Sequence, residues 1–256
     1  MQRLALPDTG YSGRDCHQFR VVGNRLKLKT GDAKRRSMVA GYSWKFTVSM
    51  LTGLAWSLAW IIQDPPAAWA NLVMVVCCYL ITDLLGGMLH VVLDNPRSPD
   101  VAFIKPLAEG FQAHHDDQTG IFKMPLYDHL YVMHMPLTIF FVCTLPLHSS
   151  LVYVAYISMA AMLHVMQMSH RWAHMPAGAL HPVVRGLQRS RLLIRESEHG
   201  EHHHPPYQRN FCIMTGLFNR PLNAIVHVFG ARSHLWILVF LATCFVPIAL
   251  GALIPQ

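Results

Sequence analysis

The stretch AAWANLVMVVCCYLITDLLGGMLHVVL, residues 67–93, decides the fold of this chain. It is long and apolar enough to cross a hydrocarbon layer of about 30 Å as one helix, which takes about 20 residues. It also contains polar or small residues that a purely lipid-facing helix lacks, namely Asp83, the pair Gly86-Gly87 and His90. A carboxylate within a span is unfavourable unless it faces other helices and has a partner. The stretch therefore predicts a membrane helix whose polar side packs inside a bundle.

Four further apolar runs predict a polytopic helical membrane protein. Of the 256 residues, 52% are hydrophobic and 14% are charged, which is unlike an ordinary soluble domain. The other candidate spans are residues 46–62, 130–147, 151–168 and 235–254. The last of these is also compatible with a peripheral or re-entrant helix. We therefore expect an all-α fold with four to five transmembrane helices.

The basic residues predict the orientation of these spans, because short segments rich in Lys and Arg stay on the cytoplasmic side during insertion. All 21 basic residues fall in segments that alternating spans place on one side. These segments are residues 1–45 with ten, residues 94–129 with three and residues 170–233 with eight. The opposite connections, residues 63–67 and 148–150, contain only Asp64 as a charged residue. We expect a cytoplasmic N-terminus and a last helix that ends outside.

This pattern predicts three parts: a basic cytoplasmic arm at 1–42, a four-helix domain with the histidine-rich segments at 43–233, and a C-terminal hydrophobic helix at 234–256. The net charge of +7 is explained by membrane orientation and attraction to anionic headgroups, so no nucleic-acid partner is expected. The six cysteines show no framework spacing, and we expect them to be reduced.

Eight of the 17 histidines form four clusters beside the same end of the predicted spans. They are His90, the pair His114 and His115, His170 and His174 in HRWAH, and His199, His202 and His203 in HGEHH. A single histidine is more often a surface or packing residue than a ligand. Imidazole is nevertheless the commonest ligand for transition metals, and four nitrogens per ion would supply two metals with positions left for a reactant. The four clusters therefore predict a metal site on the cytoplasmic side.

Helical spacing brings members of the clusters onto shared faces. His170 and His174 are one turn apart and can chelate one ion, and HGEHH offers the same spacing if it is helical. His114 and His115 diverge by about 100° on a helix, so we expect them to serve different metals.

Four carboxylates are candidates to lie behind the ligands and orient them by hydrogen bonds: Asp83, Asp94, Asp117 and Glu198. Asp83 precedes His90 by two helical turns and Asp94 follows it by one, so the three share a face. For Asp83 two roles stay open, a hydrogen bond that orients a ligand imidazole and a hydrogen bond that packs helices.

The residues around the clusters favour O2 chemistry over hydrolysis. A zinc protease uses HExxH, whereas Arg171 follows His170 and Gly200 follows His199. A structural zinc site usually includes cysteine, and none lies within the clusters. Neutral imidazoles with open positions suit iron that binds and activates O2.

Two other metal proteins place their ligands differently. Bis-histidine haem and a metal carrier both need ligands deep in the spans, where the sequence offers only His134, His164 and Asp83. We assign packing or hydrogen-bonding roles to His134 and His164.

Four stretches together resemble the lipid desaturase family that includes plasmanylethanolamine desaturase and the plant chloroplast desaturase of phosphatidylglycerol palmitate. They are DLLGGMLH at 83–90 with Asp94, AHHDD at 113–117, HRWAH at 170–174, and HGEHHHPPYQRNFCIMTGLFNRPLN at 199–223. The resemblance covers about residues 83–222, somewhat over half of the chain.

The resemblance implies a non-haem iron centre of about two irons on the same eight histidines. It implies O2 as co-substrate and electrons from a small carrier of the cytochrome b5 or ferredoxin type. Arg191, Glu198 and Tyr207 stand where animal members have further histidines, so it stays open whether Glu198 donates a ligand.

The implied substrate is a membrane phospholipid that gains a double bond near its glycerol end. An ether-linked alkyl chain and an ester-linked acyl chain both remain open. A lipid hydroxylase of the same di-iron class is the alternative reaction, and a membrane metal-binding or transport protein is the alternative outside enzymes. Arginines between Arg171 and Arg209 are candidates for contacts with a lipid phosphate.

Overall fold

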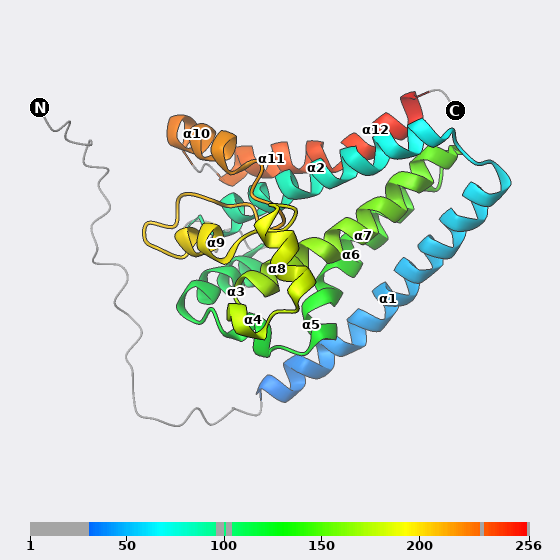
Figure 1. Cartoon of the computed structure of the whole chain (residues 1–256). Coiled ribbons are helices and arrows are strands. Elements are labelled where there is room, and N and C mark those ends of the chain that lie inside the picture. Colours follow the sequence, from blue (N-terminus) through cyan, green and yellow to red (C-terminus); the bar gives the residue numbers. More distant parts are fainter. Residues whose placement is uncertain (1–30, 96–99, 101–103, 231–232, 255–256) are drawn as a thin grey trace, which may run out of the picture. The chain divides into compact units, whose positions relative to one another are not determined.

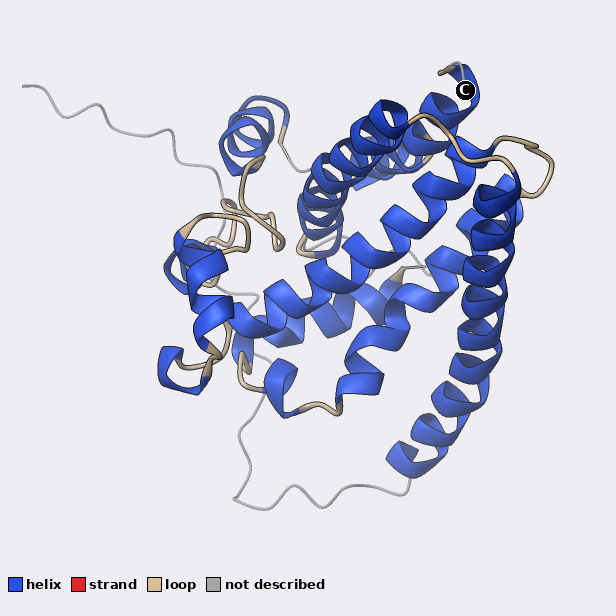
Figure 2. Ribbon diagram, turned by 45° about the vertical axis from the view of Figure 1, so that its right-hand side comes forward, coloured by secondary structure: helices blue, strands red, loops and turns tan. Residues whose placement is uncertain are grey.

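The computed structural model describes residues 31–95, 100, 104–230 and 233–254, and every regular element among them is a helix (Figure 1, Figure 2). The predicted all-α class is thus confirmed. The predicted site lies in the compact unit of residues 41–256. Residues 1–30 of the predicted arm lie outside the described residues. The division at 42 and 233 stays a prediction.

Four helices of the described chain are long and apolar enough to cross a membrane. They are the Trp44–Gln63 part of α1 (Gly31–Gln63), α2 (Ala68–Leu93), α7 (Ser150–Ala173), and Leu235–Leu253, which comprises most of α11 (Ser233–Cys244) and α12 (Val246–Leu253). The shorter elements are α3 (Lys105–Asp116), α4 (Gly120–Lys123), η3 (Ala177–Ala179), α8 (Pro182–Arg189), α9 (Glu196–His202) and α10 (Asn219–Phe229).

The predicted span at 130–147 is not among these four helices. It is divided into α5 (Leu126–Leu130), η2 (Tyr131–Met133) and α6 (His134–Thr144). At 11 residues, α6 is only about 16 Å long, less than the thickness of the hydrocarbon layer. Proline accounts for the change near the start of α6, because Pro136 lacks the N–H that would donate to the carbonyl of residue 132 in η2.

The centre of the bundle is the pair α2 and α7, which pack along each other (Figure 1). α11 and α12 cover α2, α12 also contacts α7, and α6 packs on α7. Tyr153 and Tyr156 of α7 are fully buried in this interior. α1 instead exposes large apolar side chains such as Leu51 and Trp56, as expected of a surface that faces lipid.

The two polar connections between spans lie at one end of the bundle. The Ser150 hydroxyl donates to the Asp64 carboxylate at 3.3 Å, and the Ser149 hydroxyl donates to the Gly251 carbonyl at 2.8 Å. The start of α7 therefore meets the end of α1 and the end of α12. The histidine-rich segments follow the opposite ends of α2 and α7, and the chain returns between these two helices through α5, η2 and α6. Which end faces the cytoplasm stays a prediction.

The pair Gly86-Gly87 in α2 allows residues 211–216 to pack directly on this helix. A Cβ on Gly87 would overlap Leu222 Cδ1 and lie 2.8 Å from Cys212 Sγ. A Cβ on Gly86 would lie 2.7 Å from Met166 Sδ. These glycines therefore bring together α2, α7 and the segment after α9, one turn before His90.

Hydrogen bonds from both central helices hold the same segment. The Asp83 carboxylate of α2 accepts hydrogen bonds from the backbone N–H groups of Thr215 at 2.8 Å and of Gly216 and Phe218 at 3.3 Å. On α7, the Ser169 hydroxyl donates to the Met214 carbonyl at 2.8 Å. Irregular backbone at the depth of a span needs such partners because lipid supplies none. Two roles were open for Asp83, and the structure supports the packing role, because its carboxylate holds the backbone of residues 215–218.

We expect Gly251→Ala to lower the free energy of unfolding by about 1–3 kcal/mol. Its Cβ would lie 2.9 Å from the N and Cα atoms of Val152 in α7, and a backbone cannot yield as a side chain can. Thermal unfolding in detergent measures the effect. Gly110→Ala in α3, whose Cβ meets nothing within 4 Å, is the matched control and should not destabilise the fold. Equal loss in both variants would contradict close packing of α12 on α7.

Candidate metal centre

All eight predicted histidines lie at the C-terminal ends of four helices. His90 is in the last turn of α2, His114 and His115 are in the last turn of α3, and His170 is in the last turn of α7 with His174 as its C-cap. In α9, His199 and His202 are in the last turn and His203 is the C-cap. The C-terminal end of a helix bears partial negative charge and favours a nearby cation. Four such ends converge here.

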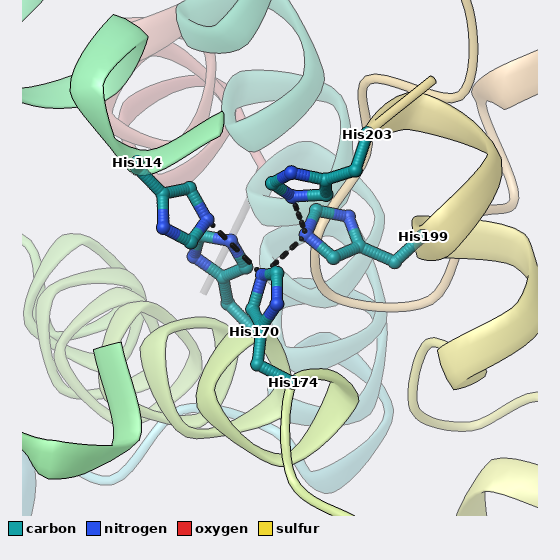
Figure 3. Close-up of side chains that lie close together, drawn as sticks. All are labelled: His114, His170, His174, His199 and His203. Carbon is teal, nitrogen blue, oxygen red and sulfur yellow. Dashed lines mark hydrogen bonds between the residues drawn. The ribbon is translucent and has the colours of Figure 1, made fainter. Parts of the chain in front are cut away.

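Five of the histidines form one group, the five-histidine group: His114, His170, His174, His199 and His203. Figure 3 shows their rings directed toward one another from α3, α7 and α9. The ligand atoms all lie within 4.8 Å of one another. The Nε2 atom of His174 is 2.9 Å from Nε2 of His199 and 3.1 Å from Nε2 of His114, and Nε2 of His203 is 3.1 Å from Nε2 of His199.

These separations are those of nitrogens around one metal ion. Two imidazole nitrogens at about 2.1 Å from an ion, at right angles to each other, are about 3.0 Å apart. Neutral imidazoles each have one N–H and one bare nitrogen, so several facing Nε2 atoms cannot all be satisfied by protons. A cation between them satisfies every lone pair at once.

The second group, the aspartate group, consists of His90, Asp94 and His202, with His115 at its edge. The Asp94 carboxylate lies 3.0 Å from Nε2 of His202 and 3.5 Å from Nε2 of His115. These two Nε2 atoms are 3.3 Å apart. The sequence predicts Asp94 to lie behind the ligands, whereas in the structure its carboxylate lies among the imidazole nitrogens and is a candidate oxygen ligand.

Backbone carbonyls orient two rings of the aspartate group. Nδ1 of His90 donates to the Gly86 carbonyl at 3.1 Å, and Nδ1 of His202 donates to the Arg209 carbonyl at 2.8 Å. Since Nδ1 holds the proton in both rings, Nε2 of a neutral ring presents its lone pair to the group. Nε2 of His202 then faces a carboxylate, an arrangement that requires a cation, either a proton or a metal ion.

Two buried nitrogens support the metal assignment directly. Nε2 of His90 and Nε2 of His170 have no hydrogen-bond partner within the described part of the chain, and both side chains are at least 95% buried. Buried polar atoms are nearly always satisfied, so an orphaned nitrogen at such a site indicates a missing ligand. The donor set of imidazoles and one carboxylate, without thiolate, fits iron of the non-haem type.

The surroundings keep the rings neutral and available to a metal. Burial, followed by the neighbouring histidines, lowers the pKa of His114 and of His174 to about 3. The same causes lower the pKa of His199 and His203 well below the ordinary value. Burial alone would raise the pKa of Asp94, but its hydrogen bond with His202 and the nearby imidazoles lower it, so the carboxylate is ionised.

The remaining predicted carboxylates have other partners. Asp117 is exposed and accepts hydrogen bonds from the backbone N–H and the hydroxyl of Thr119. Glu198 Oε1 accepts a hydrogen bond from Asn219 Nδ2 at 3.0 Å. Asp83 holds the backbone of residues 215–218, as described above. The structure thus gives none of these three a contact with a ligand imidazole among its described hydrogen bonds.

The two histidines of the predicted spans are bonded locally. Nδ1 of His134 is 2.8 Å from the Thr47 hydroxyl, and Nδ1 of His164 donates to the Ala160 carbonyl at 2.6 Å. These contacts agree with the packing and hydrogen-bonding roles that we expect for them.

Aromatic neighbours of the ligands were not predicted from sequence. Tyr207 stacks on His115 with ring centroids 4.5 Å apart, and Phe111 meets His90 edge-on at 4.9 Å. No spacing in the sequence pairs these rings. The one sequence signal is the position of Phe111 one helical turn before His115 on α3, which indicates that Phe111 lies near the histidine clusters.

Comparisons with known proteins identify relatives of this chain. "Fatty acid desaturase 4, chloroplastic" from Arabidopsis thaliana is 31% identical over 172 residues, which cover 62% of this chain and 52% of the relative. "Plasmanylethanolamine desaturase" from Myxococcus xanthus is 29% identical over 174 residues, which cover 65% and 60%. The chain thus aligns with 52–60% of the length of these curated relatives. No solved structure matches the chain significantly.

A family model described as "Lipid desaturase domain" matches residues 79–242, which include all eight histidines and Asp94. This match covers more than half of the chain and confirms the resemblance inferred from the motifs. The chain belongs to the lipid desaturase domain family.

Proposed function

We propose that this protein is a membrane-bound, iron-dependent lipid desaturase that uses O2. It introduces a double bond near the glycerol end of a phospholipid alkyl or acyl chain. The observation that supports this most strongly is the convergence of seven histidines and Asp94 into two adjacent groups of candidate ligands at one end of α2 and α7, with His115 at the edge of the second. Membership of the lipid desaturase domain family supports the reaction.

Two irons are proposed, one per group. Bound iron supplies the redox chemistry by which O2 is reduced to water while two hydrogens leave adjacent carbons. Reduction of O2 to two waters takes four electrons and four protons. The lipid supplies two of each as its two hydrogens leave, so two further electrons and two protons must come from elsewhere. We propose a small donor protein of the cytochrome b5 or ferredoxin type as the source of the electrons.

The residues of the chain position and shield this chemistry. Carbonyl groups of residues 86 and 209 fix the His90 and His202 rings, and Asp94 adds negative charge that suits a dication. His90, His170, His199 and His202 are at most 5% exposed, so water has little access to the ligands. Exclusion of water favours transfer of hydrogen from the lipid over unproductive side reactions.

The location of the groups supports a target near the glycerol. They lie where the apolar parts of α2 and α7 end, which is the depth of the headgroups and not of the acyl tails. The named relatives act on a fatty acid and on plasmanylethanolamine, so the ether and ester alternatives both remain. Placement of the metal centre on the cytoplasmic side remains part of the proposal, supported by the distribution of basic residues.

The metal content tests the centre. The purified protein should hold about two irons per chain after anaerobic reconstitution, and His199→Ala should retain about one or fewer because His199 lies between His174 and His203. Elemental mass spectrometry measures the iron. His227→Ala on α10, an exposed histidine outside both groups, is the matched control. Less than one iron in the unaltered protein would refute the proposal.

Lipid analysis tests the reaction. Cells that express the protein should contain phospholipids lacking two hydrogens, and His170→Ala should lower their amount at least about 100-fold because an orphaned ligand nitrogen is lost. Mass spectrometry detects the new double bonds, and acid lability separates vinyl ethers from unsaturated acyl chains. Lipids that gain one oxygen instead would identify a hydroxylase. Full activity of His170→Ala would exclude the five-histidine group from the reaction.

A further inference from the structure

A cavity of about 620 Å³ opens beside the five-histidine group. Its walls come from the end of α7, from α8 and from α9. His174 and His199 belong both to this cavity and to the five-histidine group. A molecule in the cavity therefore lies next to the candidate metal centre. The volume is in the range of sites that bind small organic groups.

Three arginines make one wall of this cavity cationic: Arg185, Arg189 and Arg195. Arg185 and Arg189 lie one turn apart on α8. Arg195 donates from Nε to the Gln188 carbonyl at 3.1 Å and from Nη2 to the Arg189 carbonyl at 2.7 Å. It thereby holds the end of α8 in place while its charge remains at the cavity.

The acidic residues of the cavity do not cancel this charge. Glu201 accepts a hydrogen bond from Asn210 Nδ2 at 3.1 Å and lies 4.0 Å from Nε of Arg209, which is outside the cavity lining. Glu196 is exposed at the start of α9. Three cations against these two carboxylates leave the cavity suited to an anion.

A buried amide donor points to the same kind of ligand. Gln188 is only 8% exposed and lines the cavity between Arg185 and Arg189. Its Nε2 is buried and has no hydrogen-bond partner within the described part of the chain. A buried N–H₂ group without a partner is rare in folded proteins and requires an acceptor. An anionic oxygen in the cavity would be that acceptor.

We propose that this cavity binds the phosphate of a phospholipid headgroup and so aligns the glycerol end of the lipid with the metal centre. This inference rests on the proposed function and adds to it the group by which the substrate is recognised. The phosphate diester is joined to the glycerol whose chain is desaturated, so anchoring it beside His174 and His199 brings the first carbons of the chain to the metals. Guanidinium groups bind phosphate oxygens in pairs, which Lys cannot do.

Equilibrium binding to the iron-loaded protein in detergent tests the cavity without turnover. The probes are short-chain phosphatidylglycerol, diacylglycerol with the same chains, and inorganic phosphate. The combined change Arg185→Ala and Arg189→Ala should weaken phosphatidylglycerol binding about tenfold or more, and leave diacylglycerol binding unchanged. Gln188→Glu, which is nearly isosteric, should weaken it similarly by repelling the anion. Arg220→Ala on α10, an exposed arginine outside the cavity, is the matched control.

The outcomes separate this inference from the proposed function. Loss of phosphatidylglycerol binding in both variants with iron content and diacylglycerol binding retained supports the headgroup site, even if no double bond is formed. Unchanged phosphatidylglycerol binding would overturn it, even if desaturation is confirmed. Inorganic phosphate that binds as tightly as the lipid would also overturn it, because the cavity would then bind a free anion. Slower reduction by an acidic donor protein with lipid binding intact would assign the arginines to that protein.

Discussion

The convergence of bare imidazole nitrogens in a buried space is the constraint on which the rest of the structure depends. Within each of the two groups the ligand atoms lie within 4.8 Å of one another, and several adjacent pairs are about 3 Å apart, although burial keeps most of these rings neutral. Lone pairs in such an arrangement repel one another and are shielded from water. Cations among them would make the arrangement favourable, which agrees with the proposal that the fold holds these side chains in place for metal ions.

The scaffold achieves this by ending four helices at one place. The dipoles of α2, α3, α7 and α9 all present their negative ends to the two groups. The segment after α9 is fastened between the central helices by Asp83 of α2 and Ser169 of α7, and Gly86-Gly87 leaves room for it. Small and polar residues within the apolar spans are thus explained by the need to position the groups.

The position of the candidate centre relative to the apolar spans supports the proposed lipid substrate. The groups occupy the end of α2 and α7, and the arginine-lined cavity opens beside them. A phosphate in that cavity and a chain in the hydrocarbon layer would place the glycerol between the two. Recognition of the headgroup and oxidation of the neighbouring carbons would then require no withdrawal of the lipid from the membrane.

The sequence by itself determined the helical class and four of the five predicted spans, and it predicted that the eight histidines lie at one end of the bundle, because hydrophobic run length and helical spacing are local properties. It did not predict the division of 130–147 into η2 and α6 near Pro136, because apolar composition does not report where helical hydrogen bonds change.

Only the tertiary structure decided the partners. It divided the ligands into groups of five and three with His115 at the edge of the second. In the structure the Asp94 carboxylate lies among the candidate ligands, and the Asp83 carboxylate accepts hydrogen bonds from the backbone of residues 215–218. Gln188 lines the same cavity as the three arginines. These outcomes depend on packing between segments as many as 135 residues apart, which no local pattern encodes.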